Sequence, residues 1–321
     1  MLNVINLLCG IGMFLIGMSL MSDYTTLTFG NRLKDILSRL ANNKVSGMLT
    51  GLAVTGIIQS SCATTVAAVS FVDAGLLSLS GAAGIVMGAN IGTTVTSLII
   101  AFNFSSVAPL AIFIGAFMKL LCKKERLQNA GIIFCGFGIL FVGMGTMSSA
   151  FESLKNSEAF LSFVAASQGK FQGIITGFIM TTLMQSSSAT VGILQALSMQ
   201  GIISPENAFY NILGQNIGAV VPVMLSSVGT DKTAKQVGVI HLLFNIIGTL
   251  FFIVLMEFLP TEKLFSFTEN NSMKISLFHL TFNTVSTIVL LPFSEQLITL
   301  SNKILSFKII RTKASKLTQN S

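Results

Sequence analysis

Charged residues are scarce in this chain of 321 residues. Asp, Glu, Lys and Arg together make up 10% of it, whereas hydrophobic types make up 52%; an average soluble chain carries roughly 25% charged residues. Because charged side chains normally cover a surface that faces water, this composition excludes an ordinary soluble domain. The mean hydropathy of +0.79 agrees, and we expect a polytopic protein of the lipid bilayer.

Other scarce residue types narrow the function further. The four cysteines show no CxxC spacing, so neither a disulfide framework nor a zinc site is predicted. Trp is absent and Tyr occurs twice, and we interpret the 26 Phe residues as lipid-facing bulk with no cofactor implied. The net charge of +7 does not indicate nucleic acid, because the basic residues form short clusters between apolar runs instead of lining one face.

Long apolar runs predict the membrane crossings, each of which takes roughly 20 residues for about 30 Å of hydrocarbon. The runs lie near 2–21, 79–101, 106–122, 131–149, 205–228, 236–256 and 275–293. The first lacks the basic start and the cleavage site of a signal peptide, so we keep it as a helix. Two more stretches, 45–72 and 173–199, are interrupted by polar clusters. We expect seven full crossings and two hairpins that each enter and leave on one side.

Lys and Arg in the connections predict the orientation, because cytoplasmic loops carry an excess of them. Segments 22–44 and 119–126 and the tail 301–321 are basic, whereas 150–172 is balanced and 257–273 is mainly acidic. We therefore expect a multi-pass protein of the cytoplasmic membrane, with its amino terminus outside and its carboxyl terminus inside.

The chain also repeats itself with an offset of 126 residues (185 minus 59). This offset places Gln59-Ser60-Ser61-Cys62-Ala63-Thr64 on Gln185-Ser186-Ser187-Ser188-Ala189-Thr190. It also places Gly88-Ala89-Asn90-Ile91-Gly92 on Gly214-Gln215-Asn216-Ile217-Gly218, and Cys9-Gly10-Ile11-Gly12 on Cys135-Gly136-Phe137-Gly138. Apolar bias alone does not keep glutamine, asparagine and glycine in one register, so we interpret the match as a duplication.

Charge indicates that the two copies are inverted, because the basic segment 22–44 has the neutral counterpart 150–172. Inverted repeats are typical of secondary transporters, whose sites lie between the repeats near the middle of the membrane. The predicted fold is an all-α polytopic membrane protein with two inverted repeats and re-entrant hairpins. We place the first repeat at 1–126, the second at 127–256, a loop and final transmembrane helix at 257–300 and a basic cytoplasmic tail at 301–321.

Each hairpin tip is a candidate anion site. A straight helix over 45–72 would be about 42 Å long, so a break at Gln59 to Ser61 suits a hairpin that reaches mid-bilayer, with Ser60 or Ser61 as the N-cap of its second half. Polar groups at that depth must face protein, water or a ligand. The second half-helix presents unpaired N–H groups and a positive dipole end, which bind anions without a basic side chain. Two tips entering from opposite sides would close on one anion.

The apolar span after each hairpin is a candidate cation site. We expect Asn90-Ile91-Gly92 and Asn216-Ile217-Gly218 to break these helices and free their carbonyls. Together with Asn90, Thr93 and Thr94 they form an all-oxygen environment for a hard cation, of which sodium is the obvious candidate. Ala219 and Val220 replace the two threonines in the second copy, so the halves need not bind the same number of ions.

At these motifs the chain resembles the type II sodium-dependent phosphate cotransporter family, whose hallmark is a duplicated Gln-Ser-Ser-Ser followed by Gly-x-Asn-Ile-Gly-Thr. The resemblance covers roughly residues 5–295 and implies sodium-driven transport of inorganic phosphate. It implies phosphate at Gln59, Ser60, Ser61, Gln185, Ser186 and Ser187, and sodium at Thr64, Asn90, Thr93, Thr94, Ser188, Thr190 and Asn216. Cys62 and Ala219 depart from the family's serine and threonine. Some bacterial relatives carry a regulatory domain after the last span, and we expect none here. The resemblance leaves a homodimer open.

Three alternative functions compete with sodium-coupled phosphate transport. Another small oxyanion could be the solute, and a passive anion channel would use the same tips. A membrane enzyme with Ser60 or Ser186 as nucleophile and His241 as base would need a group to orient the histidine, and no acidic residue accompanies His241 in its apolar run.

Three further polar residues carry weaker signals. His241 and His279 open matching His-x-x-Phe-Asn strings, which also resemble bacterial members of the family. For each we favour a buried neutral histidine bonded to a neighbouring helix over a proton relay. For Asp73 we favour a solvated hairpin end over a cation ligand.

Overall fold

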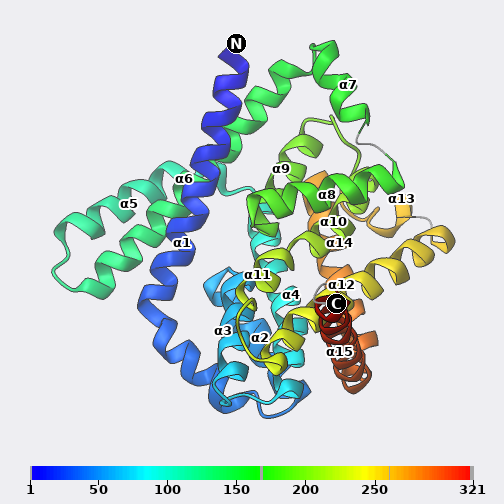
Figure 1. The fold of residues 1–321 in the computed structure, drawn as a ribbon. Helices are drawn as coiled ribbons and strands as arrows, with labels where there is room; N and C mark the ends of the chain where they lie inside the picture. The colour runs from blue at the N-terminus through cyan, green and yellow to red at the C-terminus, as the bar shows by residue number, and fades with distance from the viewer. Residues whose placement is uncertain (1, 167–168, 260, 319–321) are drawn as a thin grey trace.

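The computed structural model of the protein describes residues 2–166, 169–259 and 261–318, and all regular structure in those residues is helical (Figure 1). The elements of the first half are α1 (Leu2–Leu40), α2 (Lys44–Ile58), α3 (Ser61–Asp73), α4 (Leu79–Ala101), η1 (Phe104–Ser106) and α5 (Ala108–Leu121). They are followed by α6 (Glu125–Leu154), α7 (Glu158–Ala166), α8 (Lys170–Met184), α9 (Ser187–Met199), α10 (Pro205–Gly218) and α11 (Val221–Ser226). The chain ends with α12 (Lys232–Phe258), α13 (Thr261–Leu264), α14 (Asn271–Leu290) and α15 (Ser294–Thr318).

Six helices in the described part of the chain are long and apolar enough to cross a membrane: α1, α4, α6, α10 continued by α11, α12 and α14. The expectation of a seventh full crossing over 106–122 needs correction. There α5 has only 14 residues, about 21 Å at 1.5 Å per residue. The chain turns at Asn103, which has a φ of 50°, and η1 follows before α5 begins at Ala108, with Pro109 in its first turn.

Two expected loops are mainly helical. Segment 22–44 is the second half of α1, because no proline interrupts it and Leu33 and Leu37, one turn apart, are both buried. Segment 150–172 holds the end of α6 and all of α7. The tail from 301 onward belongs to α15 as far as Thr318. Its side chains are described as far as Ser306, and residues 319–321 lie outside the described residues.

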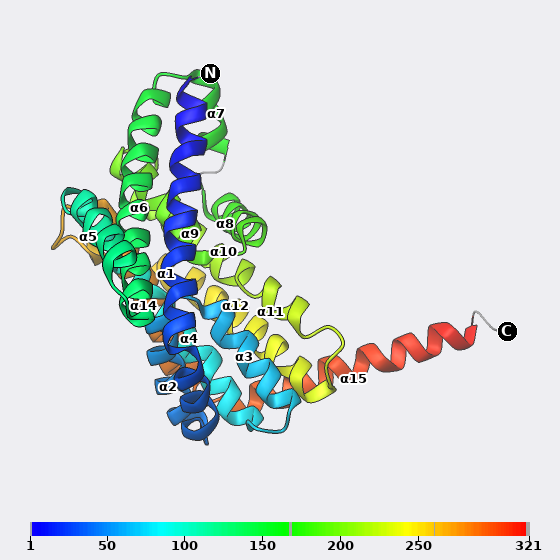
Figure 2. The same cartoon turned by 90° about the vertical axis from the view of Figure 1, so that its left-hand side faces the viewer.

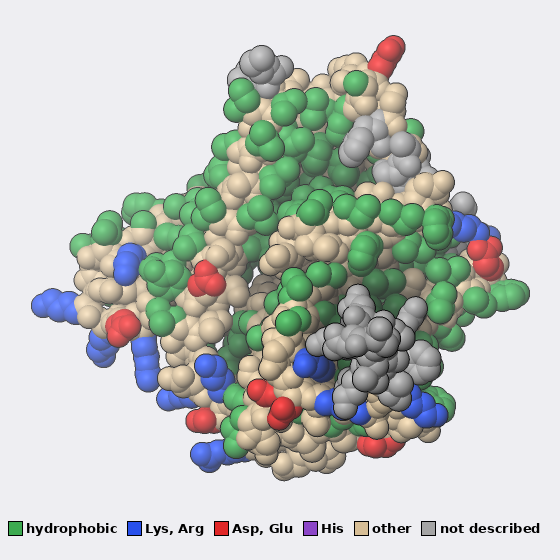
Figure 3. All heavy atoms as spheres, viewed as in Figure 1, with side chains coloured by type: hydrophobic (Ala, Val, Ile, Leu, Met, Phe, Trp, Pro, Cys, Tyr) green, Lys and Arg blue, Asp and Glu red, His purple; other side chains and the backbone are tan. Residues whose placement is uncertain are grey.

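The two repeats run in opposite directions, which confirms the predicted inverted architecture. In Figure 2, α1 descends from the amino terminus and α6 rises beside it, while the hairpin α2–α3 lies at the lower end of the molecule and α8 and α9 lie above it. Most Lys and Arg side chains on the face shown in Figure 3 lie in its lower half, toward the end of α1.

Glycines hold α1 against α6 at two equivalent points. A Cβ added at Gly10 would lie 3.0 Å from the carbonyl oxygen of Gly143, and one added at Gly17 would lie 2.6 Å from that of Gly136. The offset of 126 residues relates Gly10 to Gly136 and Gly17 to Gly143. The two contacts are therefore one contact repeated by a two-fold axis, and each requires the close backbone approach that small residues permit.

Glycines also attach each hairpin to the helix that follows it. A Cβ at Gly51 in α2 would collide with the carbonyl of Ile85 in α4, and one at Gly177 in α8 would collide with that of Asn211 in α10. Further glycines at these two interfaces are Gly47, Gly84, Gly88, Gly92, Gly173, Gly214 and Gly218. Their spacing of four residues is the sequence signal for such close helix packing.

A pair of buried threonine hydroxyls joins the two halves of each hairpin. Thr55 of α2 donates to Thr64 of α3 at 2.9 Å, and Thr181 of α8 donates to Thr190 of α9 at 3.0 Å. Each acceptor hydroxyl also bonds back to the carbonyl of the serine before its helix. The hairpins are therefore fixed both at their glycines and beside their tips.

The substitution Gly17→Val tests the contact between α1 and α6. Because its nearest neighbours are backbone atoms of Gly136 and Leu140 that no rotamer change can move, we expect it to destabilise the protein by about 3 kcal/mol or more, the upper end for overpacking. Gly12→Val is the matched control in the same helix, since no heavy atom lies within 4 Å of a Cβ there. Equal thermal melting of both variants in detergent would contradict this packing.

The substitution Thr55→Val tests the hydroxyl contact within the first hairpin. Removing one buried hydrogen bond costs roughly 1 kcal/mol, so we expect faster hydrogen exchange of the amides near the tip. Thr50→Val is the control in the same helix, because the hydroxyl of Thr50 bonds only within α2, to Ser46. Unchanged exchange at the tip in Thr55→Val would show that the contact is dispensable.

Candidate functional site

The two hairpin tips have the same backbone geometry. Gln59 and Gln185 end α2 and α8 in the left-handed conformation, with φ of 63° and 53°. Ser60 and Ser186 then act as the N-caps of α3 and α9, so of the two expected caps, Ser60 and Ser61, it is Ser60 that caps α3. Each Oγ accepts the N–H of the third residue along at 3.2 Å. A left-handed conformation is costly for a residue with a Cβ. Because it occurs at the equivalent glutamine of both copies, the surrounding structure must stabilise the sharp reversal at each tip.

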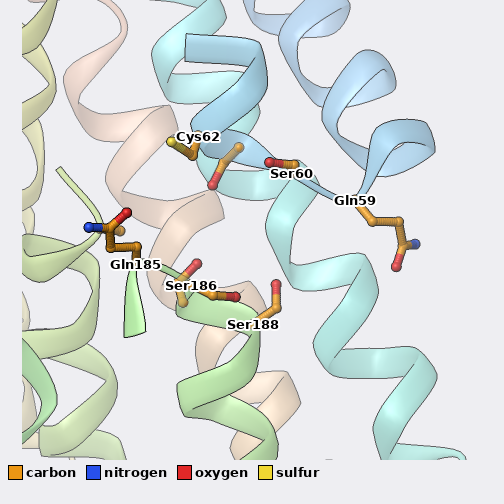
Figure 4. Close-up of a pocket in the computed structure, with 9 residues that line it drawn as sticks. Gln59, Ser60, Cys62, Gln185, Ser186 and Ser188 are labelled. Carbon is orange, nitrogen blue, oxygen red and sulfur yellow. The ribbon is translucent and has the colours of Figure 1, made fainter. Parts of the chain in front are cut away.

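The tips enclose one small polar cavity of about 50 Å³, several times the roughly 10–15 Å³ that one water molecule requires. It is lined by Gln59, Ser60, Ser61, Cys62, Gln185, Ser186, Ser187, Ser188 and Ala219. Figure 4 shows Ser60 and Cys62 on one side and Ser186 and Ser188 on the other. None of the lining residues carries a charge.

Hydrogen-bond donors face this cavity without protein partners. The amide N–H groups of Ser61 and Cys62 are the first in α3, and among the described residues neither has an acceptor. The same holds for Ser187 and Ser188 in α9. The hydroxyl groups of Ser61, Ser187 and Ser188 also form no hydrogen bond within the described part of the protein. Two helix N-termini thus point unpaired donors and positive dipole ends at one space, an arrangement suited to an anion.

The glutamine side chains do not converge on the cavity centre. Figure 4 shows those of Gln59 and Gln185 extending away from each other. The Oε1 of Gln59 accepts from the hydroxyl of Thr96 at 3.2 Å, and its Nε2 donates to the carbonyl of Gly56 at 3.4 Å. In this arrangement the glutamines form the tips by their backbones more than by their carboxamides.

The expected breaks at the two Asn-Ile-Gly motifs occur in only one copy. Helix α4 is continuous through Asn90, whose Nδ2 donates to the carbonyl of Val86 at 2.8 Å. Thr93 and Thr94 likewise bond back to carbonyls one turn earlier in α4. In the second copy the helix ends at Gly218 and resumes as α11, where Pro222 lies in the first turn. The expectation of freed carbonyls in α4 was therefore wrong.

The candidate sodium ligands lie in different places. Ser188 lines the cavity. Thr64 and Thr190 are buried in the contacts between the hairpin halves, and Asn216 donates to the carbonyl of Ile212 at 2.8 Å. Hydroxyl and amide oxygens can accept or coordinate while their hydrogens are donated elsewhere, so these residues keep oxygen lone pairs available.

A buried polar cluster was missed in the sequence. The Nε2 of Gln195 in α9 lies 3.1 Å from the carbonyl of Ser97 in α4 and 2.7 Å from the hydroxyl of Ser276 in α14. Ser97 and Ser276 also bond to each other at 2.9 Å. The cluster joins the second hairpin to α4 and α14. A glutamine in the middle of an apolar helix was the available signal.

The two histidines and Asp73 differ in the contacts that they make. His241 is buried and its Nε2 lies 3.2 Å from the Nδ2 of Asn90, so it does bond to a neighbouring helix. His279 is buried too, but its ring has no hydrogen-bond partner among the described residues. Asp73 at the end of α3 is exposed and accepts the backbone N–H of Asp231 at 2.8 Å, so it joins the hairpin end to the start of α12.

Comparison with known proteins gives consistent matches. A model of the Na+/Pi-cotransporter family matches residues 13–149 and 142–286. The "Putative inorganic phosphate export protein YjbB" of Escherichia coli K12 is 30% identical over 251 residues, 78% of this chain and 46% of that protein. The chain thus spans about half the length of this relative. "Uncharacterized protein YqeW" of Bacillus subtilis is 29% identical over 251 residues, 77% of this chain and 81% of YqeW.

A mammalian relative matches a shorter segment. "Sodium-dependent phosphate transport protein 2A" of Mus musculus is 37% identical over 103 residues, 32% of this chain and 16% of that protein. No solved structure matches the chain. The two segments of the family match fit the two copies in the sequence, and together they cover most of the helical core. The chain therefore belongs to the Na+/Pi-cotransporter family, a family of membrane transporters.

Proposed function

We propose that this protein carries inorganic phosphate across the cytoplasmic membrane coupled to sodium, and that it holds the phosphate between the tips of α3 and α9. The observation that carries the proposal is the single cavity where two helix N-termini, related by the repeat, present four unpaired amide N–H groups and three free hydroxyl groups. We infer that the two repeats, 1–126 and 127–256, together form the transport unit.

Phosphate suits this cavity for two reasons. Its oxygen atoms, spread tetrahedrally, can accept from donors on both tips at once, and the aligned dipoles favour its negative charge. The absence of a basic side chain among the lining residues lets the anion leave again, because a direct ion pair in a low dielectric would hold it far more strongly. A carrier must release its solute as well as bind it.

Sodium provides the missing positive charge in this proposal. Oxygen ligands are preferred by hard cations, and the candidates are Thr64, Asn90, Thr93, Thr94, Ser188, Thr190 and Asn216. The two halves are unequal, since Ala219 in the cavity wall stands where the first copy has Thr93. The family's description as Na+/Pi-cotransporters supports sodium as the coupling ion.

The direction of net transport follows from the gradients. One relative is named for phosphate export and another for sodium-dependent phosphate transport. Because the sodium gradient is directed inward and the site opens alternately to both sides, we infer that the protein moves phosphate into the cell. The basic ends of α1 and the α5–α6 connection would then face the cytoplasm.

The substitutions Ser61→Ala and Ser187→Ala test the phosphate site. Each removes one cavity hydroxyl that has no protein partner, so we expect phosphate uptake into proteoliposomes to fall about tenfold or more, with melting temperature unchanged. Ser60→Ala is the comparison: it removes an N-cap, so we expect a loss of stability of roughly 1 kcal/mol as well. Normal uptake by both cavity variants would remove the site assignment.

Sodium dependence tests the coupling. With phosphate equal on both sides, an inward sodium gradient should drive phosphate accumulation, and replacing sodium by potassium should abolish it. Accumulation that ignores the sodium gradient would refute coupling, and a large uncoupled anion current would favour a passive channel. Counterflow with sulfate and arsenate in place of phosphate separates phosphate from other oxyanions.

A further inference from the structure

The two His-x-x-Phe-Asn helices form a second internal repeat, with an offset of 38 residues (279 minus 241). It relates His241, Asn245 and Thr249 of α12 to His279, Asn283 and Thr287 of α14. The same local bond occurs in both, since Asn245 donates to the carbonyl of His241 at 3.1 Å and Asn283 to that of His279 at 3.0 Å. The two-fold relation between the hairpin repeats therefore extends to α12 and α14.

One pair of contacts obeys this symmetry. The hydroxyl of Thr249 in α12 donates to the carbonyl of Leu213 in α10 at 3.2 Å. Its equivalent, the hydroxyl of Thr287 in α14, donates to the carbonyl of Met87 in α4 at 3.4 Å. Leu213 and Met87 are themselves separated by the offset of 126 residues. Each of the two histidine helices is thus anchored in the same way to the helix that follows one of the hairpins, α12 to α10 and α14 to α4.

A second pair of contacts breaks the symmetry. In the first half, the Nδ2 of Asn90 reaches both the carbonyl of Val86 at 2.8 Å and the Nε2 of His241 at 3.2 Å. In the second half, the Nδ2 of Asn216 reaches the carbonyl of Ile212 at 2.8 Å. It has no second acceptor within the described residues.

The unused groups of the second half are complementary. Asn216 keeps one amide hydrogen without an acceptor, and the Nε2 of His279 lacks a donor in the part of the chain that the structure describes. Asn216 and His279 are 3% and 1% exposed, so little water is available to satisfy them. Helix α10 contacts α14, as α4 contacts α12. A bond between Asn216 and His279 would be the symmetry equivalent of the one present between Asn90 and His241.

We propose that these two contacts alternate during transport: the Asn90–His241 contact is made in the state described here, and the Asn216–His279 contact is made in the state that opens to the other side. The proposal rests on the proposed function in requiring alternating access to the cavity. An inverted repeat can exchange the conformations of its halves with no net change in the number of bonds. One hydrogen bond broken and an equivalent one made keeps the two states close in free energy.

The native cysteine of the cavity provides the test. Cys62 lines the cavity, so its reaction with a membrane-impermeant thiol reagent, measured from each face of the membrane, reports to which side the cavity opens. The background has Cys9, Cys122 and Cys135 replaced by alanine, and vesicles of both orientations are labelled without phosphate or sodium. His241→Ala and Asn90→Ala remove a contact of the present state, whereas His279→Ala and Asn216→Ala remove one of the other state.

We expect the ratio of the two labelling rates to shift roughly fivefold in opposite directions for the two pairs of variants, the change that one net hydrogen bond produces. Thr249→Val and Thr287→Val are the matched controls, because their contacts are made in both halves, and we expect no shift for either. The two asparagine variants keep the test valid if a histidine variant fails to fold. Shifts in the same direction, or no shift, would overturn the proposal.

The outcome is separable from that of the proposed function. Opposite shifts in a protein that moves no phosphate would support the alternation of the two contacts and refute phosphate as the transported solute. Sodium-driven phosphate uptake without opposite shifts would refute the alternation alone.

Discussion

The structure depends on one constraint: a helix that breaks in the middle of a membrane leaves amide groups that lipid cannot satisfy. The breaks after Gln59 and Gln185, which we expect near mid-bilayer depth, create this situation twice. The surrounding protein removes most of the cost by placing both breaks face to face around a polar cavity. The donors that remain unpaired are those to which we assign the anion, so the part of each hairpin with unsatisfied donors is also its proposed binding site.

Packing around the tips follows from that constraint. A tip can stay at one depth only if its two half-helices cannot slide, and glycine contacts to α4 and α10 together with the Thr55–Thr64 and Thr181–Thr190 bonds provide this restraint. The antiparallel contact of α1 with α6, made through glycines on both helices, sets the two repeats in opposite senses. The uncharged cavity and the inverted arrangement of the repeats therefore depend on the same helix contacts.

Much of this could be predicted from the sequence, because the informative residues are polar residues in apolar surroundings and their pattern occurs twice. The register of Gln59-Ser60-Ser61 on its second copy predicts the hairpins, their caps and their meeting. Side-chain directions could not be predicted, since the carboxamide of Gln59 turns toward Thr96, a partner from another helix. The continuity of α4 was also unpredictable: Asn90 weakens an isolated helix, but here its side chain bonds within α4 and to His241.

The Gln195 cluster has no polar counterpart across the two-fold axis. The offset of 126 residues relates Gln195 to Val69 and Ser97 to Val223, and both valines belong to an apolar cluster that also includes Val237 of α12. Polar bonds fix distance and angle between helices, whereas apolar surfaces in contact tolerate small displacements at nearly constant energy. The two ends of the molecule therefore differ in stiffness, and shear between neighbouring helices meets less resistance beside Val69 than beside Gln195.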